Sequence, residues 1–205
     1  MATSCRIVKR GRRVARSGRG AGATESAVVR EIAASLPWLV PGSVVALVVS
    51  IVASGRVGAW LRIHRVAAAV LLFSLGIILV GTLTPLAAEE VLPPEARDTC
   101  DFSRTWLATP ADLASGDDVV INILMFIPFG FAVGAIPWTK RKAAVIIAAI
   151  ALPLAIEGIQ LLILQLGRGC QAADVVDNLS GLFIGFFAGI PLSLWSTPAR
   201  RRSGD

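Results

Sequence analysis

The chain has 205 residues, of which 55% are hydrophobic and 17% charged, with a formal net charge of +6 and a mean hydropathy of +0.71. So apolar a composition, with long uncharged runs, excludes an ordinary soluble domain and indicates a membrane protein. Because the runs are continuous rather than alternating, they predict helices and not the strands of a transmembrane barrel.

The N-terminal segment, residues 1–35, is strongly basic. Its many Arg and Lys residues are opposed only by Glu25 and Glu31, and Gly, Ala and Ser are abundant. This composition predicts a disordered tail that interacts with anionic lipid rather than with nucleic acid.

Five apolar runs approach the ~20 residues that a helix needs to cross a bilayer. They lie at 36–54, 66–86, 119–138, 143–166 and 175–195. The fold class expected is therefore all-α, a polytopic transmembrane helix bundle of about five spans. Four regions follow: the basic tail 1–35, an extra N-terminal transmembrane segment with a basic loop at 36–65, a membrane domain at 66–195, and a basic tail at 196–205.

Charge in the loops predicts the orientation. The 55–65 loop, the 139–142 turn and the C-terminal tail are basic, whereas the 87–117 loop is mostly acidic. The positive-inside rule places the basic segments, including the C-terminus, in the cytoplasm. The 87–117 and 167–174 loops then lie outside, in a multi-pass protein of the cell membrane.

The first span does not fit this orientation, because a full crossing leaves the basic tail outside. Three alternatives stay open. The segment crosses fully, or Pro37 and Pro41 mark a re-entrant or interfacial segment, or translation starts further along at Val28 or Val29. We favour five spans.

Cys100 and Cys170 fall in the two loops assigned to the outside. An oxidising exterior permits a disulfide between them, and the alternative is two unrelated small residues. There is no CxxC pair, and His64 stands alone between Arg62 and Arg65. We therefore expect no metal site and no cofactor.

A near-repeat stands at the start of two apolar runs. Asp118-Val-Val-Ile-Asn122 and Asp174-Val-Val-Asp-Asn178 lie 56 residues apart, and each places an acid and an amide on one helix face. The offset suggests two repeated helical hairpins related by an axis along the membrane normal.

Further polar groups lie between these segments. Glycines spaced four residues apart along the same helix face turn at least the second segment toward a neighbouring helix. A carboxylate at Glu157, well inside a predicted span, is costly unless it is paired, protonated or wetted. We group these residues into one candidate outer-leaflet polar site: Asp118, Asn122, Glu157, Gln160, Arg168, Asp174 and Asn178. The alternative is structural glue, in which each interhelical bond contributes only ~0.6 kcal/mol.

Several of these motifs form an ordered set: Thr82-Leu-Thr-Pro85, Asp118-x3-Asn122 continuing to Gly130, Glu157-x2-Gln160, Arg168, and Asp174-x3-Asn178-x2-Gly181. In order and spacing the set resembles the VanZ-like family of bacterial membrane proteins, over about 66–195. Leu179 and Ser180 depart from the family's pattern. The family is named for a member associated with resistance to the glycopeptide antibiotic teicoplanin, and the resemblance implies no biochemical mechanism.

Three functions are compatible with these residues. The first is a non-enzymatic envelope protein that modulates glycopeptide susceptibility. The second is a membrane-embedded enzyme acting on a lipid or lipid-linked cell-wall head group, with Glu157 as general acid or base and Arg168 on a phosphate. The third is a small transporter with a proton-relaying carboxylate.

The sequence lacks a Ser/His/Asp set, a phosphate-binding glycine loop and a tight carboxylate cluster, which disfavours an enzyme without excluding one. The partners expected are membrane lipid and, as further candidates, a lipid-linked cell-wall precursor or a glycopeptide.

Overall fold

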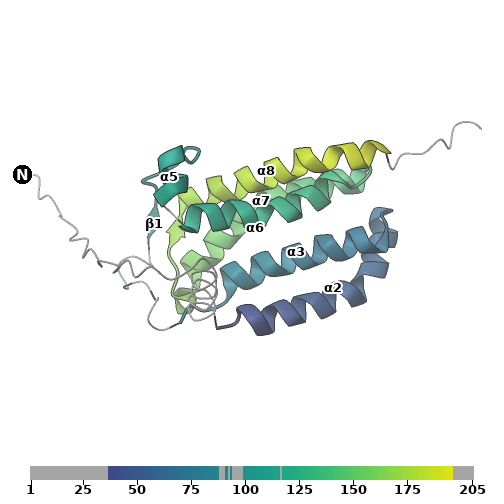
Figure 1. The fold of residues 1–205 in the computed structure, drawn as a ribbon. Helices are drawn as coiled ribbons and strands as arrows, with labels where there is room; N and C mark the ends of the chain where they lie inside the picture. Colours follow the sequence, from purple (N-terminus) through teal and green to yellow (C-terminus); the bar gives the residue numbers. More distant parts are fainter. Residues whose placement is uncertain (1–36, 88–90, 92, 94–98, 116, 196–205) are drawn as a thin grey trace, which may run out of the picture.

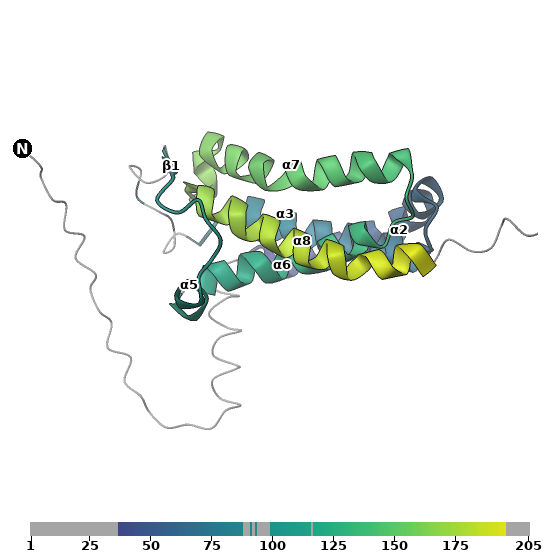
Figure 2. The same cartoon turned by 90° about the horizontal axis from the view of Figure 1, so that it is seen from above.

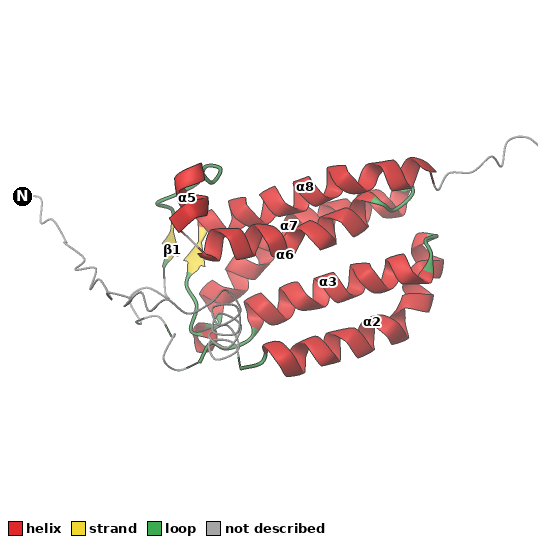
Figure 3. Ribbon diagram, viewed as in Figure 1, coloured by secondary structure: helices red, strands yellow, loops and turns green. Residues whose placement is uncertain are grey.

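The computed structural model describes residues 37–87, 91, 93, 99–115 and 117–195. Figures 1 and 3 show a bundle of long helices with a small loop region at one end. In chain order the elements are α2 (Leu39–Leu61), α3 (Arg65–Leu83), β1 (Cys100–Asp101), α5 (Pro110–Ser115), α6 (Asp117–Gly134), α7 (Lys140–Leu162), η1 (Leu164–Leu166), β2 (Cys170–Gln171) and α8 (Ala172–Trp195). The all-α membrane bundle expected from the sequence is confirmed. The two tails, 1–35 and 196–205, lie outside the described residues.

Among the described residues, four helices are long and apolar enough to cross a membrane, namely α2, α3, α7 and α8. The third predicted span is represented by the shorter apolar helix α6, whose 18 residues extend about 27 Å at the helical rise. It ends at Gly134 instead of Trp138, since Pro137 follows closely and cannot continue a helix. The described residues therefore contain four helices of full spanning length and one helix slightly shorter than the ~30 Å hydrocarbon core.

The first span is one continuous helix, α2, which runs antiparallel to α3 (Figure 1). Its length agrees with a full crossing rather than with a re-entrant segment. Small residues on α2 face α3: a Cβ added at Gly42 would meet Val80, and one added at Gly76 would meet Ala46. Close approach of two helices through small residues is typical of packing within a bilayer.

The most extensive contact in the structure joins α6 to α8, which lie side by side and run in the same direction (Figure 2). A Cβ added at Gly181, Gly185 or Gly189 of α8 would lie 2.0–2.2 Å from a backbone carbonyl oxygen of α6. The same holds in reverse for Gly130 and Gly134 of α6, which face carbonyl oxygens of α8 at 2.1 Å. The two backbones therefore touch directly, and the glycine stripes do face protein.

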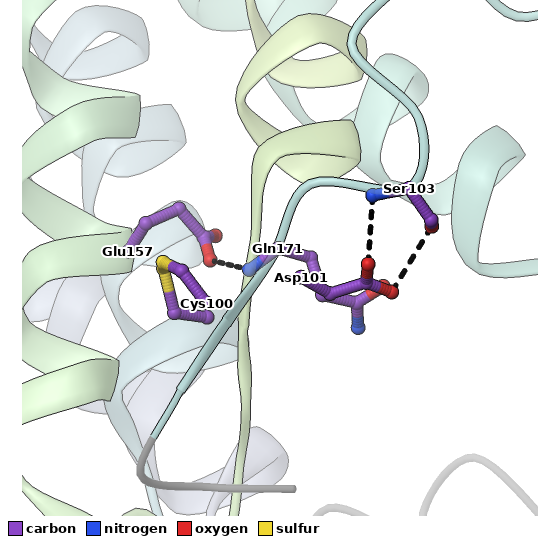
Figure 4. Close-up of a disulfide and its surroundings, with 6 residues drawn as sticks. Cys100, Asp101, Ser103, Glu157 and Gln171 are labelled. Carbon is purple, nitrogen blue, oxygen red and sulfur yellow. Dashed lines mark hydrogen bonds between the residues drawn. A yellow bond between two sulfur atoms is a disulfide. The ribbon is translucent and has the colours of Figure 1, made fainter. Parts of the chain in front are cut away.

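A disulfide joins Cys100 to Cys170, whose Cα atoms are 4.5 Å apart and whose sequence separation is 70. The same pair begins the parallel pairing of β1 with β2. Figure 4 shows this disulfide beside the α7 helix. The bond fastens the long loop that follows α3 to the short segment that precedes α8.

We expect Gly185→Ala to destabilise the protein by roughly 1–3 kcal/mol, the usual cost of overpacking. The new methyl group would lie 2.0 Å from the carbonyl oxygen of Ile127, and backbone cannot move aside as a flexible side chain can. The measurement is the thermal unfolding midpoint of the purified protein in detergent. Gly158→Ala on α7 is the matched control, because a Cβ there meets nothing within 4 Å. Equal midpoints for the two variants would contradict direct backbone contact between α6 and α8.

The cysteines give a second prediction. In a Cys5→Ser background, we expect no addition of a maleimide–polyethylene glycol reagent before reduction, and two additions after it, because Cys100 and Cys170 are paired. Closing a loop of this length stabilises the fold by about 4 kcal/mol on the chain-entropy account. Reduction should therefore also lower the unfolding midpoint. Cys100→Ser should give one addition without reduction, and two additions to the unreduced Cys5→Ser protein would show that the bond does not form.

Candidate functional site

The polar residues singled out in the sequence gather at one end of the bundle. The N-termini of α6 and α8 lie there, beside α5 and the β1–β2 pair (Figures 1 and 2). Because α6 and α8 are parallel, Asp118 and Asp174 stand in the first turns of two neighbouring helices. Carboxylates are favoured there by the partial positive charge of helix N-termini. We call this region the polar end.

Glu157 is buried, with 4% of its surface exposed, and its carboxylate accepts a hydrogen bond of 2.8 Å from the backbone N–H of Gln171 (Figure 4). The α7 helix ends at Leu162 rather than at the predicted Leu166, and the chain turns back through η1. Glu157 therefore lies about a turn and a half from the helix end, shallower than the sequence implied. Its carboxylate holds the β2 segment against α7.

Gln160 and Arg168 both bind the end of α3. The Nε2 atom of Gln160 donates to the carbonyl oxygen of Thr82 at 3.0 Å, and Nη2 of Arg168 donates to that of Gly81 at 2.7 Å. These carbonyls belong to the last turn of α3, whose oxygens have no partner within the helix. A cation at a helix C-terminus also interacts favourably with the helix dipole. Both side chains thus cap α3 from elsewhere in the chain.

Two buried polar atoms at the polar end have no hydrogen-bond partner among the described residues, Nε of Arg168 and Oδ1 of Asn178. Asn178 is 1% exposed. Burial lowers the pKa of the Arg168 guanidinium, and the neighbouring carboxylates of Asp174, Asp118 and Glu157 act in the opposite direction. Asn122 and Asp174 are half-buried and Asp118 is exposed. Asp174 and Asp118 therefore form the accessible side of the polar end.

The strongest ion pair at this end was not predicted. Arg104, in the loop after β1, donates through Nη1 to Oδ1 of Asp177 at 3.0 Å, and its Nη2 contacts Oδ2. Asp177 is fully buried, and the hydrogen bonds to it raise the pKa of Arg104. A buried carboxylate requires such a partner.

The sequence contained a signal for this pair. The two near-repeats differ at their fourth position, where the first has Ile121 and the second Asp177. An acid that replaces an apolar residue on a spanning helix needs a positively charged partner. Arg104 is one of the few positively charged residues in a loop that is mostly acidic.

The seven predicted residues thus lie at one end of the fold, but they have different surroundings. Glu157 and Gln160 are engaged with backbone groups, Arg168 is engaged in part, and Asn178 has an unpartnered oxygen. No group of three or more His, Cys, Asp or Glu residues within the described segments is arranged to hold a metal ion. The polar end contains positive and negative side chains as well as hydrogen-bond donors and acceptors, so it can bind a polar group.

Comparison with known proteins agrees with these motifs. The model of the VanZ/LLP1 family matches residues 88–193, just over half of the chain, from the loop after α3 to the end of α8. No curated protein and no solved structure matches the chain. The matched segment contains the disulfide, both near-repeats and all of the α6–α8 pair except the last two residues of α8, and on this basis the chain belongs to the VanZ/LLP1 family.

Proposed function

We propose that this protein is a multi-pass component of the bacterial cell membrane that modulates susceptibility to glycopeptide antibiotics through its polar end. On the orientation expected from loop charge, the polar end faces the outer leaflet and the C-terminus the cytoplasm. Family membership supports a VanZ-like membrane protein. The antibiotic and the outer-leaflet site are our extension from the family's namesake and from the chemistry of the polar end.

The observation that carries the proposal is the pair of buried, unpartnered atoms, Nε of Arg168 and Oδ1 of Asn178. A buried polar group without a partner costs about 1–3 kcal/mol. A ligand that supplies one acceptor and one donor recovers that cost. A peptide amide supplies both, and glycopeptides and lipid-linked cell-wall precursors are rich in such amides. Membrane lipid is the other partner that we expect at this site.

The enzymatic alternative has less support. A general acid or base at Glu157 would need a free carboxylate, whereas this carboxylate accepts from the Gln171 backbone and faces inward. The transporter alternative also depends on Glu157 as the proton-relaying group. Both remain distinguishable from modulation by experiment.

We expect Asn178→Ala and Arg168→Lys to reduce the protection against teicoplanin in a susceptible host, at matched protein levels. Each variant removes one of the unpartnered atoms, and a loss of about 1–3 kcal/mol corresponds to binding at least fivefold weaker. Ser180→Ala is the control, since this hydroxyl bonds only to the Val176 carbonyl of its own helix. If both variants protect as well as wild type, the function does not pass through the polar end.

The same strains separate modulation from catalysis. We expect expression of the wild-type protein to change teicoplanin sensitivity while the pools of membrane lipids and lipid-linked precursors, measured by mass spectrometry, stay as they were. Glu157→Gln at equal protein level is the informative variant. A pool that changes with the wild type and reverts with Glu157→Gln would favour the enzyme.

A further inference from the structure

The opposite end of the bundle contains a cavity that the polar end does not explain. It lies where the α2–α3 turn meets the α6–α7 turn, at the far end from α5 and β1 in both Figures 1 and 2. Its volume is about 160 Å³, and it is lined by Leu61, Arg62, Thr139, Lys140 and Arg141. That volume is roughly ten times what a single water molecule needs. We call this region the basic end.

The basic end has cations and, among the described residues, no acid. Its cations are Arg56, Arg62, Arg65, Lys140, Arg141 and Lys142. Every described Asp and Glu lies instead on β1, α5, the first half of α6, the last turns of α7 or the start of α8, all toward the polar end. The cavity therefore attracts anions, with no internal counterion to neutralise it.

The cations at this end are not equivalent. Nζ of Lys142 donates to the Gly134 carbonyl at 2.8 Å and is fully buried, and Arg65 donates to Oγ of Ser54 at 3.1 Å. Arg141 donates to the Trp60 carbonyl and lies over its ring. The side chains of Arg62 and Lys140, in contrast, have no hydrogen-bond or ion-pair partner in the described part of the chain. These two line the cavity with their donors unused.

The backbone around the cavity supports anion binding independently. Arg62 ends α2 with φ 60°, a left-handed conformation in which glycine is the usual residue. Facing it, α7 begins at Lys140, and the Thr139 side chain caps only the N–H of Lys142. The cavity is therefore lined by the N-terminal residues of a long helix, where the first backbone N–H groups carry partial positive charge.

Two exposed tryptophans at this end are typical of a membrane–water interface. Trp60, in the last turn of α2, is 50% exposed, and Trp138, in the α6–α7 turn, is 60% exposed. Tryptophan is enriched at the level of the lipid head groups, where phosphates lie. On the orientation expected from charge, these are the head groups of the cytoplasmic leaflet, which are rich in anionic lipid.

We propose that this cavity is a phosphate-binding site, in which Arg62, Lys140 and Arg141 hold the phosphate of an anionic phospholipid. Arg141 is anchored by its bond to the Trp60 carbonyl, and the two unengaged cations close on the ligand. The site is separate from the polar end, so its loss need not affect teicoplanin susceptibility.

The test is a titration of the purified full-length protein in mixed micelles with phosphatidylglycerol, phosphatidylcholine or inorganic phosphate, with bound lipid counted by native mass spectrometry. We expect saturable binding of phosphatidylglycerol and weaker binding of phosphatidylcholine. Lys140→Gln and Arg62→Asn should each weaken the binding of phosphatidylglycerol about fivefold, the usual effect of one basic side chain near an anionic membrane. Asparagine is chosen because it tolerates the left-handed backbone at position 62.

Arg56→Gln is the matched control: it removes one positive charge from the same end of α2 but does not line the cavity. If it weakens binding as much as Lys140→Gln, attraction at this end is diffuse and the site is refuted. Retained binding in Lys140→Arg, at an unchanged unfolding midpoint, supports the site independently of folding defects. Binding of inorganic phosphate in preference to the lipid would overturn the lipid as the source of the phosphate.

Discussion

The direct contact between the backbones of α6 and α8 is the constraint on which the rest of the fold depends. In lipid, apolar side chains give helices no hydrophobic reason to associate, so close packing must supply the attraction. Here each helix receives carbonyl oxygens of the other at positions where no Cβ stands, at Gly130 and Gly134 of α6 and at Gly181, Gly185 and Gly189 of α8. The two stripes are complementary rather than repeated, because their positions differ from the 56-residue offset of the Asp-x3-Asn segments. A fixed register follows, since sliding would bring side chains into the gaps.

This register has an electrostatic consequence. Parallel helices place both N-termini, and so both partial positive charges, at the same end of the bundle. Asp118 and Asp174 stand in those first turns. The near-repeat therefore serves in part to begin a helix, and it does so for both α6 and α8 at the polar end. Arg168, with Arg104 bound to the additional Asp177, offsets part of the negative charge that accumulates there.

Much of the fold could be predicted from the sequence, because crossing a bilayer requires apolar runs of a set length that can be found along the chain. Long apolar runs located the helices, and glycines four residues apart located the face through which α8 packs. The ends of helices were harder to predict, because Leu164-Gln165-Leu166 continues the apolar run of α7 although the helix stops at Leu162. Nothing in local hydrophobicity separates a last α-helical turn from a 3₁₀ turn that reverses the chain.

The candidate site was predicted as a set of residues but not as a set of contacts. The ion pair joins Arg104 to Asp177, which are 73 positions apart in the sequence. Such a pair depends on the path of a loop, which carries no periodic signal. The α3 carbonyls that Gln160 and Arg168 bind are equally invisible, because every residue has a carbonyl and only the fold decides which are left unpaired.

These contacts also change how the polar end must be interpreted. Backbone groups that leave a helix and lie within the protein have no water to satisfy them, so side chains must do so. Glu157 satisfies the N–H of Gln171 and Gln160 the carbonyl of Thr82, which gives both a structural reason to be polar. The same reason does not apply to Oδ1 of Asn178, which is buried and unpartnered among the described residues. A buried polar atom that the fold does not use is better evidence for a ligand than a buried carboxylate that it does use, so Asn178 is a stronger candidate for ligand binding than Glu157.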